Sequence, residues 1–344
     1  MNSLKSSKDG NVYIPFENRS GNKSVVYFTR DLSEKGLEKI FEYVSKNLKG
    51  KIAIKLHTGE REGPNILPRP WVKNLIEKKL KDATIVETNT LYKGGRYTEE
   101  DHRKTLEING WNFCPVDIMD GKEVTTLPIK GGKWLQEIHV GKNMLNYDSM
   151  LVLTHFKGHT TGGFGGSNKN IGIGCADGKF GKKEVHSTLK SLNLWANEKE
   201  LFMERMTEST KGTIDFFKDN ISYINVMRNM SVSCDCEGAN AEPVKTPDVG
   251  ILASLDILAI DSACIDIIYN LKEHAGKHMI ERIESRHGLR QLSYMKELNM
   301  GNDLYTIIDI DNNDKEITIK EICENTNTTW IPDKYNTFKG RNNI

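Results

Sequence analysis

Residues 149–178 read SMLVLTHFKGHTTGGFGGSNKNIGIGCADG, an apolar run followed by a glycine-rich segment. The apolar run, Ser149 to Thr154, predicts a central strand that is buried on both faces, as strands of parallel sheets are. The glycine-rich backbone follows almost directly, from Gly158 to Gly178. Because ligands of parallel sheets bind at the carboxyl ends of strands, this segment is predicted to carry a binding site.

Strand and helix patterns alternate on both sides of this segment. Further strands are predicted at residues 24–29, 51–56, 83–87, 221–227, 249–253 and 304–310, with short β pieces at 124–129, 136–140 and 317–319. Helical spacing of apolar residues predicts helices at 33–48, 70–81, 98–109, 183–218, 257–271 and 289–298. The alternation predicts an α/β protein with a mostly parallel sheet and helices on both faces.

The length of 344 residues allows two domains. A polar start rich in Ser, Lys, Asn and Gly predicts a flexible arm over residues 1–22. We expect one α/β lobe at residues 23–220, containing the glycine-rich site loop 154–187, and a second α/β lobe at residues 221–344. The site is then expected to lie between the two lobes.

The charges are balanced, with 48 Lys and Arg against 47 Asp and Glu, so no basic excess predicts nucleic acid as a partner. No apolar run reaches the roughly 18–20 residues that a membrane span needs. Residues 1–25 also lack the apolar core of a signal peptide. We therefore expect a cytoplasmic protein that binds a small molecule and neither a membrane nor a nucleic acid.

The site loop 154–187 also contains side chains that can ligate or react, namely Lys157, His159, Lys169, Asn170, Cys175 and His186. Glycine permits left-handed backbone and lets N–H groups approach a ligand closely. A flexible surface loop is the alternative interpretation. Flexible linkers do not usually contain so many potential ligands and nucleophiles, so a binding site is favoured.

Several separated motifs occur in the order found in a known family. They are THFKGH, GGFGG, KNIGIGC, CDCEGANAEPVKTPDVGILAS and LAIDSACIDII. Over about residues 25–310 the chain thus resembles the domain-of-unknown-function 362 family, the iron–sulfur centre protein group. Many members carry an inserted ferredoxin module with C-x-x-C-x-x-C-x-x-x-C-P, and this sequence has no such run. The resemblance implies an iron–sulfur or other metal cofactor without that insert.

A more distant resemblance concerns the nickel-pincer lactate racemases, which have a segment of the form His-x-x-A-G-F-S-G-G-x-Lys. Here His159 and Lys169 are separated by the same ten residues, with glycines and a phenylalanine between them. The resemblance implies that Lys169 anchors a pincer-type cofactor, that His159 is a general base and that His186 binds nickel. It further implies that the cofactor is surrounded by Gly163, Gly165, Gly166 and Asn170.

The racemase pattern is incomplete at a second place. Those enzymes have another catalytic histidine just before an Arg-x-x-Thr-Glu-Glu stretch, and here Gly94 and Gly95 precede Arg96. Racemisation of lactate itself is therefore not expected, even with a shared pocket.

Polar residues also follow the strand predicted at 51–56. Lys55 and His57 are candidate catalytic residues, because ligand contacts gather at the carboxyl ends of strands. Arg61 resembles an arginine with which the racemases bind a carboxylate. An ordinary polar turn explains these residues equally well.

Cys234 and Cys236 form a C-x-C pair in a loop after a predicted strand. Together with Cys175 and His186 they could form a thiolate-rich site for zinc, nickel or iron. The alternative is that they are structural, since C-x-x-C is the commoner spacing of ligands and free cysteines behave as small buried apolar residues.

Two hypotheses for the function follow. The first is an enzyme, an isomerase or oxidoreductase, that uses a metal ion or pincer-type cofactor on a small carboxylate-type molecule at His159, Lys169 and His186. The second is an iron–sulfur or metal-binding redox or maturation protein without turnover of its own, for which we expect a redox partner protein.

Overall fold

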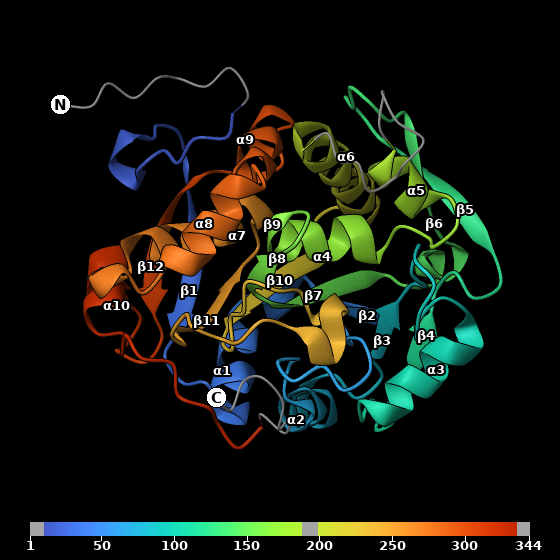
Figure 1. Ribbon diagram of the computed structural model, residues 1–344, viewed down its shortest axis with the longest axis horizontal. Coiled ribbons are helices and arrows are strands. Elements are labelled where there is room, and N and C mark those ends of the chain that lie inside the picture. Colours follow the sequence, from blue (N-terminus) through green and yellow to red (C-terminus); the bar gives the residue numbers. More distant parts are fainter. Residues whose placement is uncertain (1–9, 188–198, 336–344) are drawn as a thin grey trace.

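The computed structural model describes residues 10–187 and 199–335. Its centre is a nine-stranded sheet with the order β13-β12-β1-β11-β10-β7-β2-β3-β4 (Figure 1). These strands are β1 (Lys23–Thr29), β2 (Ile52–Lys55), β3 (Thr84–Glu87), β4 (Val116–Ile118), β7 (Ser149–His155), β10 (Ile221–Met227), β11 (Gly250–Ser254), β12 (Leu304–Asp309) and β13 (Lys315–Ile317). Two hairpins stand beside it, β5 (Val124–Pro128) with β6 (Glu137–Gly141), and β8 (Lys157–His159) with β9 (Gly163–Gly165).

Most strands of the sheet run in one direction. β10, β7, β2, β3 and β4 pair in parallel, and β12 is parallel to β1. β11 is antiparallel to both β1 and β10, and β13 is antiparallel to β12. The predicted α/β class with a mostly parallel sheet is confirmed.

Helices cover both faces of the sheet, as predicted (Figure 1). Their bounds are α1 (Glu34–Val44), α2 (Arg69–Lys79), α3 (Glu99–Ile108), α4 (Ser167–Gly174), α5 (Gly181–His186), α6 (Lys199–Phe217), α7 (Ile257–Asn270), α8 (Lys277–Ser285), α9 (Arg290–Glu297) and α10 (Ile319–Glu324). Apolar residues of α1 and α2 join the core on one face, and those of α6 and α7 join the core on the other. Among the described residues, no helix is long and apolar enough to span a membrane.

Strand β7 lies in the middle of the sheet and shows why its sequence is apolar throughout. All seven of its residues are buried. Leu151 and Leu153 belong to one hydrophobic core, and Met150 and Val152 to the core on the other face. Side chains of a strand alternate between faces, so a strand covered on both sides needs apolar residues at every position.

The largest difference from the predicted elements is in the glycine-rich segment, which was expected to be a loop. It forms the hairpin of β8 and β9 and then helix α4. The helix predicted at 183–218 corresponds to α5 and α6, and residues 188–198 between them lie outside the described part. Helix α8 was not predicted, and α10 begins at Ile319, where the last β piece was expected to end.

The two expected lobes, residues 23–220 and 221–344, both contribute strands to the nine-stranded sheet. β10, just after Asn220, pairs with β7, so strands from 23–220 and 221–344 are neighbours. Residues 1–9 of the expected arm lie outside the described part, while Arg19 forms a buried ion pair with Asp266. The division into two lobes stays a prediction.

Candidate functional site

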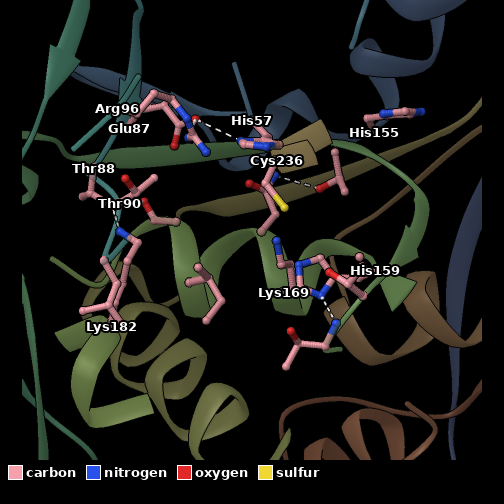
Figure 2. Close-up of a pocket in the computed structure, with 18 of the residues that line it drawn as sticks. His57, Glu87, Thr88, Thr90, Arg96, His155, His159, Lys169, Lys182 and Cys236 are labelled. Carbon is pink, nitrogen blue, oxygen red and sulfur yellow. Dashed lines mark hydrogen bonds and ion pairs between the residues drawn. The ribbon is translucent and has the colours of Figure 1, made fainter. Parts of the chain in front are cut away.

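A cavity of about 370 Å³ opens where β2, β3 and β7 end (Figure 2). Its lining comes from these strand ends, from the hairpin of β8 and β9, from α4 and α5, and from the loop after β10. Parallel strands that end at the same edge bring side chains together from distant parts of the sequence. The cavity is therefore at the position that the strand pattern predicts for a ligand.

A buried ion pair forms one wall of the cavity. Lys55 Nζ lies 3.0 Å from Glu87 Oε2 and also donates to Asn170 Oδ1 at 3.0 Å. Burial alone would raise the pKa of Glu87, but the charges of Lys55 and Arg96 and a hydrogen bond with His57 hold it well below its ordinary range. Glu87 is therefore a carboxylate that organises the positive groups around it.

His57 contributes to the same wall. Its Nδ1 lies 3.3 Å from Glu87 Oε1, and within the described ranges its buried Nε2 has no hydrogen-bond partner. Arg96 lies next to it and donates from Nε to Glu60 Oε1 at 2.9 Å. A polar atom without a partner on a cavity wall is available to a ligand.

Helix α4 carries Lys169 and Asn170 into the cavity and is held at its start by Asp261. The Asp261 carboxylate accepts from the backbone N–H groups of Ser167, at 2.8 Å, and Asn168, at 3.0 Å. Gly166 makes this possible, because a Cβ there would come within 2.5 Å of Asp261 Oδ1. A carboxylate at a helix N-terminus is favourable both as a hydrogen-bond acceptor and through the helix dipole.

Cys236 of the C-x-C pair lines the cavity, and Asp235, the residue between the two cysteines, is held in place by side chains of β7 and β8. Its Oδ2 lies 2.9 Å from His155 Nδ1 and 3.3 Å from Lys157 Nζ. Burial alone would lower the pKa of Lys157, but Asp235 and the neighbouring thiol groups raise it. Lys157 is therefore a fixed positive charge behind the cysteines.

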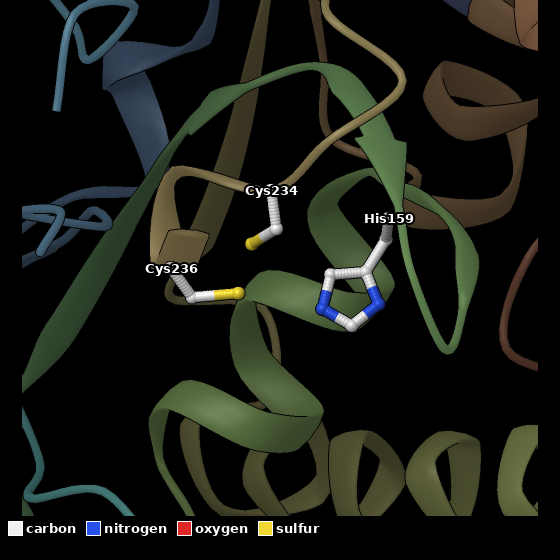
Figure 3. Close-up of side chains that lie close together, drawn as sticks. All are labelled: His159, Cys234 and Cys236. Carbon is white, nitrogen blue, oxygen red and sulfur yellow. The ribbon is translucent and has the colours of Figure 1, made fainter. Parts of the chain in front are cut away.

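His159, Cys234 and Cys236 come together although about 75 residues separate the histidine from the cysteines (Figure 3). One ligand atom from each lies within 4.8 Å of the others. Burial alone would raise the pKa of Cys234, but a hydrogen bond from Cys236 and the charge of Lys169 hold it well below its ordinary range. Cys234 is thus the thiolate and Cys236 the thiol that donates to it. Lys169 Nζ lies 3.7 Å from the Cys234 sulfur.

The tautomer of His159 follows from its backbone neighbours. Its Nδ1 accepts from the N–H groups of Gly162, at 2.8 Å, and Thr161, at 3.2 Å. The proton of the neutral ring is therefore on Nε2. Burial and the charge of Lys169 lower the pKa of His159 to about 4, so the ring is neutral at pH 7.

His186 lies in the cavity wall, at the end of α5. Burial, His159 and Lys169 lower its pKa to about 3, so it is a neutral imidazole at pH 7. Neutral imidazole is the form that binds metal ions. Its predicted role as a ligand stays a prediction.

Most of the predicted site residues line this one cavity. They are Lys55, His57, His159, Gly165, Gly166, Lys169, Asn170, His186 and Cys236, with Cys234 beside Cys236.

Three other predicted residues lie elsewhere. Cys175 belongs to the hydrophobic core, where burial raises its pKa to about 11. Arg61 lines a neighbouring, more open hollow and donates to Thr105 at 3.2 Å. Gly163 packs in a left-handed conformation against Gly288. The structure does not bring these three to the cluster of His159 and the cysteines.

Sequence reasoning missed Glu87, Thr88 and Lys182, which also line the cavity. Glu87 ends β3, and the rule that drew attention to Lys55 at the end of β2 applies to it equally. Lys182 lies in α5, with no motif around it that marks a site.

Two of the solved structures that resemble the chain show how distant the likeness is. One is a protein from Thermotoga maritima, at 16% identity and a TM-score of 0.33, covering 56% of this chain and 49% of that one. The other is the lactate racemase apoprotein from Thermoanaerobacterium thermosaccharolyticum, at 16% identity and a TM-score of 0.34, covering 62% and 52%. The chain thus spans about half the length of either, and this similarity says nothing of its chemistry.

No curated protein matches the sequence. The family model described as domain of unknown function (DUF362) matches residues 52–266, more than half of the chain. This agrees with the family that the separated motifs indicated. The chain therefore belongs to the DUF362 family.

Proposed function

We propose that the protein is an enzyme that acts on a small carboxylate-type molecule in this cavity, with a soft metal ion held at Cys234 and Cys236. The observation that carries the proposal is the pair of cysteines beside a strongly positive cavity. Five lysine and arginine side chains and one carboxylate, Glu87, line it within the described ranges. An anion of the size of a few carbon atoms suits both the charge and the volume of about 370 Å³.

The positive charges are not all neutralised by the protein. Lys55 is paired with Glu87, and Lys157 with Asp235. Lys169, in contrast, faces the Cys234 thiolate, with Nζ 3.7 Å from the sulfur, and has no carboxylate within ion-pair distance among the residues that the structure describes. A metal ion bound to that sulfur would leave the Lys169 ammonium to a ligand. A substrate carboxylate would satisfy this cation at little cost, since the surrounding groups already hold it in place.

The donor set of the cluster fits a soft metal ion. Two sulfur atoms share one proton, and zinc, nickel or iron bound there would replace that proton. A bound ion would supply Lewis-acid chemistry to a substrate oxygen. The Nε2–H of His159 points to this pair of cysteines, so we assign His159 as a hydrogen-bond donor that tunes the thiolate rather than as a third ligand.

The second hypothesis, an iron–sulfur protein, finds less support in the cysteine positions. Iron–sulfur clusters take about four thiolate ligands. Cys234 and Cys236 lie together, whereas Cys175 and Cys264 are in the hydrophobic core. Two thiolates suit a single metal ion better than a cluster.

Metal analysis and carboxylate binding test the proposal together. Protein purified without oxygen should contain a stoichiometric soft metal, and Cys236→Ser should lose most of it. The matched control is Cys114→Ser, a half-buried cysteine that does not line the cavity.

Calorimetry with propionate should show binding to the wild type and at least about tenfold weaker binding to Lys169→Met, since one charge-assisted hydrogen bond is worth roughly 1.5–3 kcal/mol. Metal retained by Cys236→Ser would move the metal site elsewhere. Absence of propionate binding would refute the carboxylate part.

A further inference from the structure

Lys182 differs from the other lysines of the cavity in its partners. Its side chain is buried on α5, and its Nζ donates to Thr88 Oγ1 at 2.5 Å and to Ala176 O at 2.7 Å. Both acceptors are uncharged. In the described part of the chain no carboxylate lies within 4.0 Å of its Nζ, whereas Lys55 and Lys157 each have one. Lys182 is a buried amine without the anion that normally keeps a lysine charged.

The two hydrogen bonds also account for both N–H groups of a neutral amine. The Thr88 hydroxyl has its own acceptors, Gly174 O at 3.1 Å and Ala176 O at 2.9 Å, so its oxygen is free to accept from Lys182. A neutral amine has two N–H groups and one lone pair. Thr88 and Ala176 take both N–H groups, and the lone pair is left for the cavity that Lys182 lines.

The charges around Lys182 agree with this geometry. Burial is the main effect and lowers the pKa of Lys182 to about 8, with a smaller contribution from Arg96. The carboxylates of Asp120, Glu87 and Asp177 oppose the shift but are too distant for ion pairs. A substantial fraction of the amine is therefore neutral near pH 8, which an exposed lysine is not.

The position of Lys182 separates it from the cysteine cluster. Figure 2 shows Lys182 beside Thr88 and Thr90, at the side of the cavity away from Lys169 and His159. A small molecule whose carboxylate meets Lys169 can present its other end to Lys182. The two lysines thus suit two different groups of one substrate.

We propose that Lys182 is the nucleophilic amine of the cavity and forms an imine with the aldehyde or ketone group of a small oxo acid. The Nζ lone pair attacks the carbonyl carbon, and one N–H proton moves to the carbonyl oxygen to give a carbinolamine. Nζ then loses its second proton, the hydroxyl group takes up a proton and leaves as water, and a C=N bond replaces the C=O bond. No electrons are gained or lost. This inference rests on the proposed function for the carboxylate of the substrate, and it does not need the metal ion.

Reductive trapping tests the inference on the full chain. The protein is incubated with glyoxylate or pyruvate and cyanoborohydride, and the modified lysine is located by peptide mass spectrometry. We expect the label on Lys182, at least about tenfold above Lys183, an exposed neighbour in the same helix and the matched control. The trapping rate should reach half of its maximum near pH 8, the pKa expected for Lys182. An exposed lysine would titrate above about pH 10.

Variants separate the alternatives. Lys182→Met should lose the label, Lys183→Met should keep it, and Lys182→Arg retains the charge but should also lose it, so a folded variant is available if the methionine variant is unstable. Label on Lys169 instead, or equal label on Lys183, overturns the inference.

Propionate, which has a carboxylate and no carbonyl, distinguishes the two failures. If propionate binds and nothing is trapped at Lys182, the imine is wrong and the proposed function stands. If propionate does not bind either, both are wrong.

Discussion

Substitution of Glu87 tests whether this buried carboxylate holds the donors of the cavity wall in place. Its Oε2 accepts from Lys55 Nζ at 3.0 Å. Its Oε1 faces His57 Nδ1 at 3.3 Å and accepts from the Thr58 N–H at 3.0 Å and the Thr58 hydroxyl at 3.2 Å. Glu87→Gln keeps the shape of the side chain and removes its charge.

The cost of this substitution can be worked from these contacts. The best orientation of the glutamine places its oxygen toward Thr58, where more donors converge. Its NH₂ group then faces the Lys55 ammonium, so two donors meet where an ion pair was. Removing one partner of a buried ion pair costs about 3–5 kcal/mol, because it leaves the other charge uncompensated. That is a large part of the roughly 5–15 kcal/mol by which folded proteins are stable.

Urea unfolding followed by circular dichroism measures the free energy of unfolding. A double-mutant cycle with Lys55→Met isolates the pair. The double variant should lose about 2 kcal/mol less than the sum of the single losses, since neither charge is then left alone. The control is Glu100→Gln, which breaks the exposed pair with Lys104 and should cost less than about 1 kcal/mol.

The reasoning about the ion pair would be refuted if the losses in free energy of unfolding of Glu87→Gln and Lys55→Met simply added in the double variant. It would be refuted equally by a Glu87→Gln variant as stable as the Glu100→Gln control.

Two further predictions concern stability. Burial and the charge of Arg96 lower the pKa of His102 from 6.5 to about 3. Between pH 6.5 and pH 3 the His102 side chain is therefore protonated in the unfolded chain and neutral in the folded one. The free energy of unfolding falls as the pH falls through this window. At pH 5 this proton uptake lowers the free energy of unfolding by about 2 kcal/mol. Urea unfolding at pH 7 and pH 5 should show that His102→Gln removes this loss, while His278→Gln, an exposed control, keeps it. Equal pH dependence in the wild type and both variants would contradict the prediction. Gly166→Ala places a Cβ 2.5 Å from Asp261 Oδ1 and should lower the free energy of unfolding by about 1–3 kcal/mol, and an unchanged urea midpoint would show that Asp261 moves aside freely.

Most of the strands and helices could be predicted because their signals are local, whereas β4, β8 and β9 were missed. The apolar run in 149–154 identified the central strand β7, and alternation of strand and helix patterns identified the class. The density of glycines in the glycine-rich segment predicts a loop, because glycine permits left-handed backbone. The segment forms helix α4 since Asp261, 94 residues from Ser167, caps the helix start. A partner so distant in sequence leaves no local signal.

The site could be predicted only in part for the same reason. The spacing of His159 and Lys169 and the C-x-C pair identified reactive residues, but not which of them meet. Cys175 is close to Lys169 in sequence and is in the core, whereas Cys234 is distant in sequence and lies beside it. Contact across a sheet edge follows from strand order, which the sequence of a single chain does not reveal.

Lys182 is the clearest example of a site residue that the sequence alone does not identify. The residues around it, FGKKEV at positions 180–185, form no motif that marks a site. What distinguishes it is burial beside two uncharged acceptors, one from the end of β3 and one from the turn after α4. A lysine becomes a nucleophile where burial removes water and no carboxylate lies within ion-pair distance. Such an absence is a property of the folded cavity, and it explains why the most reactive amine of this cavity is one that no motif marks.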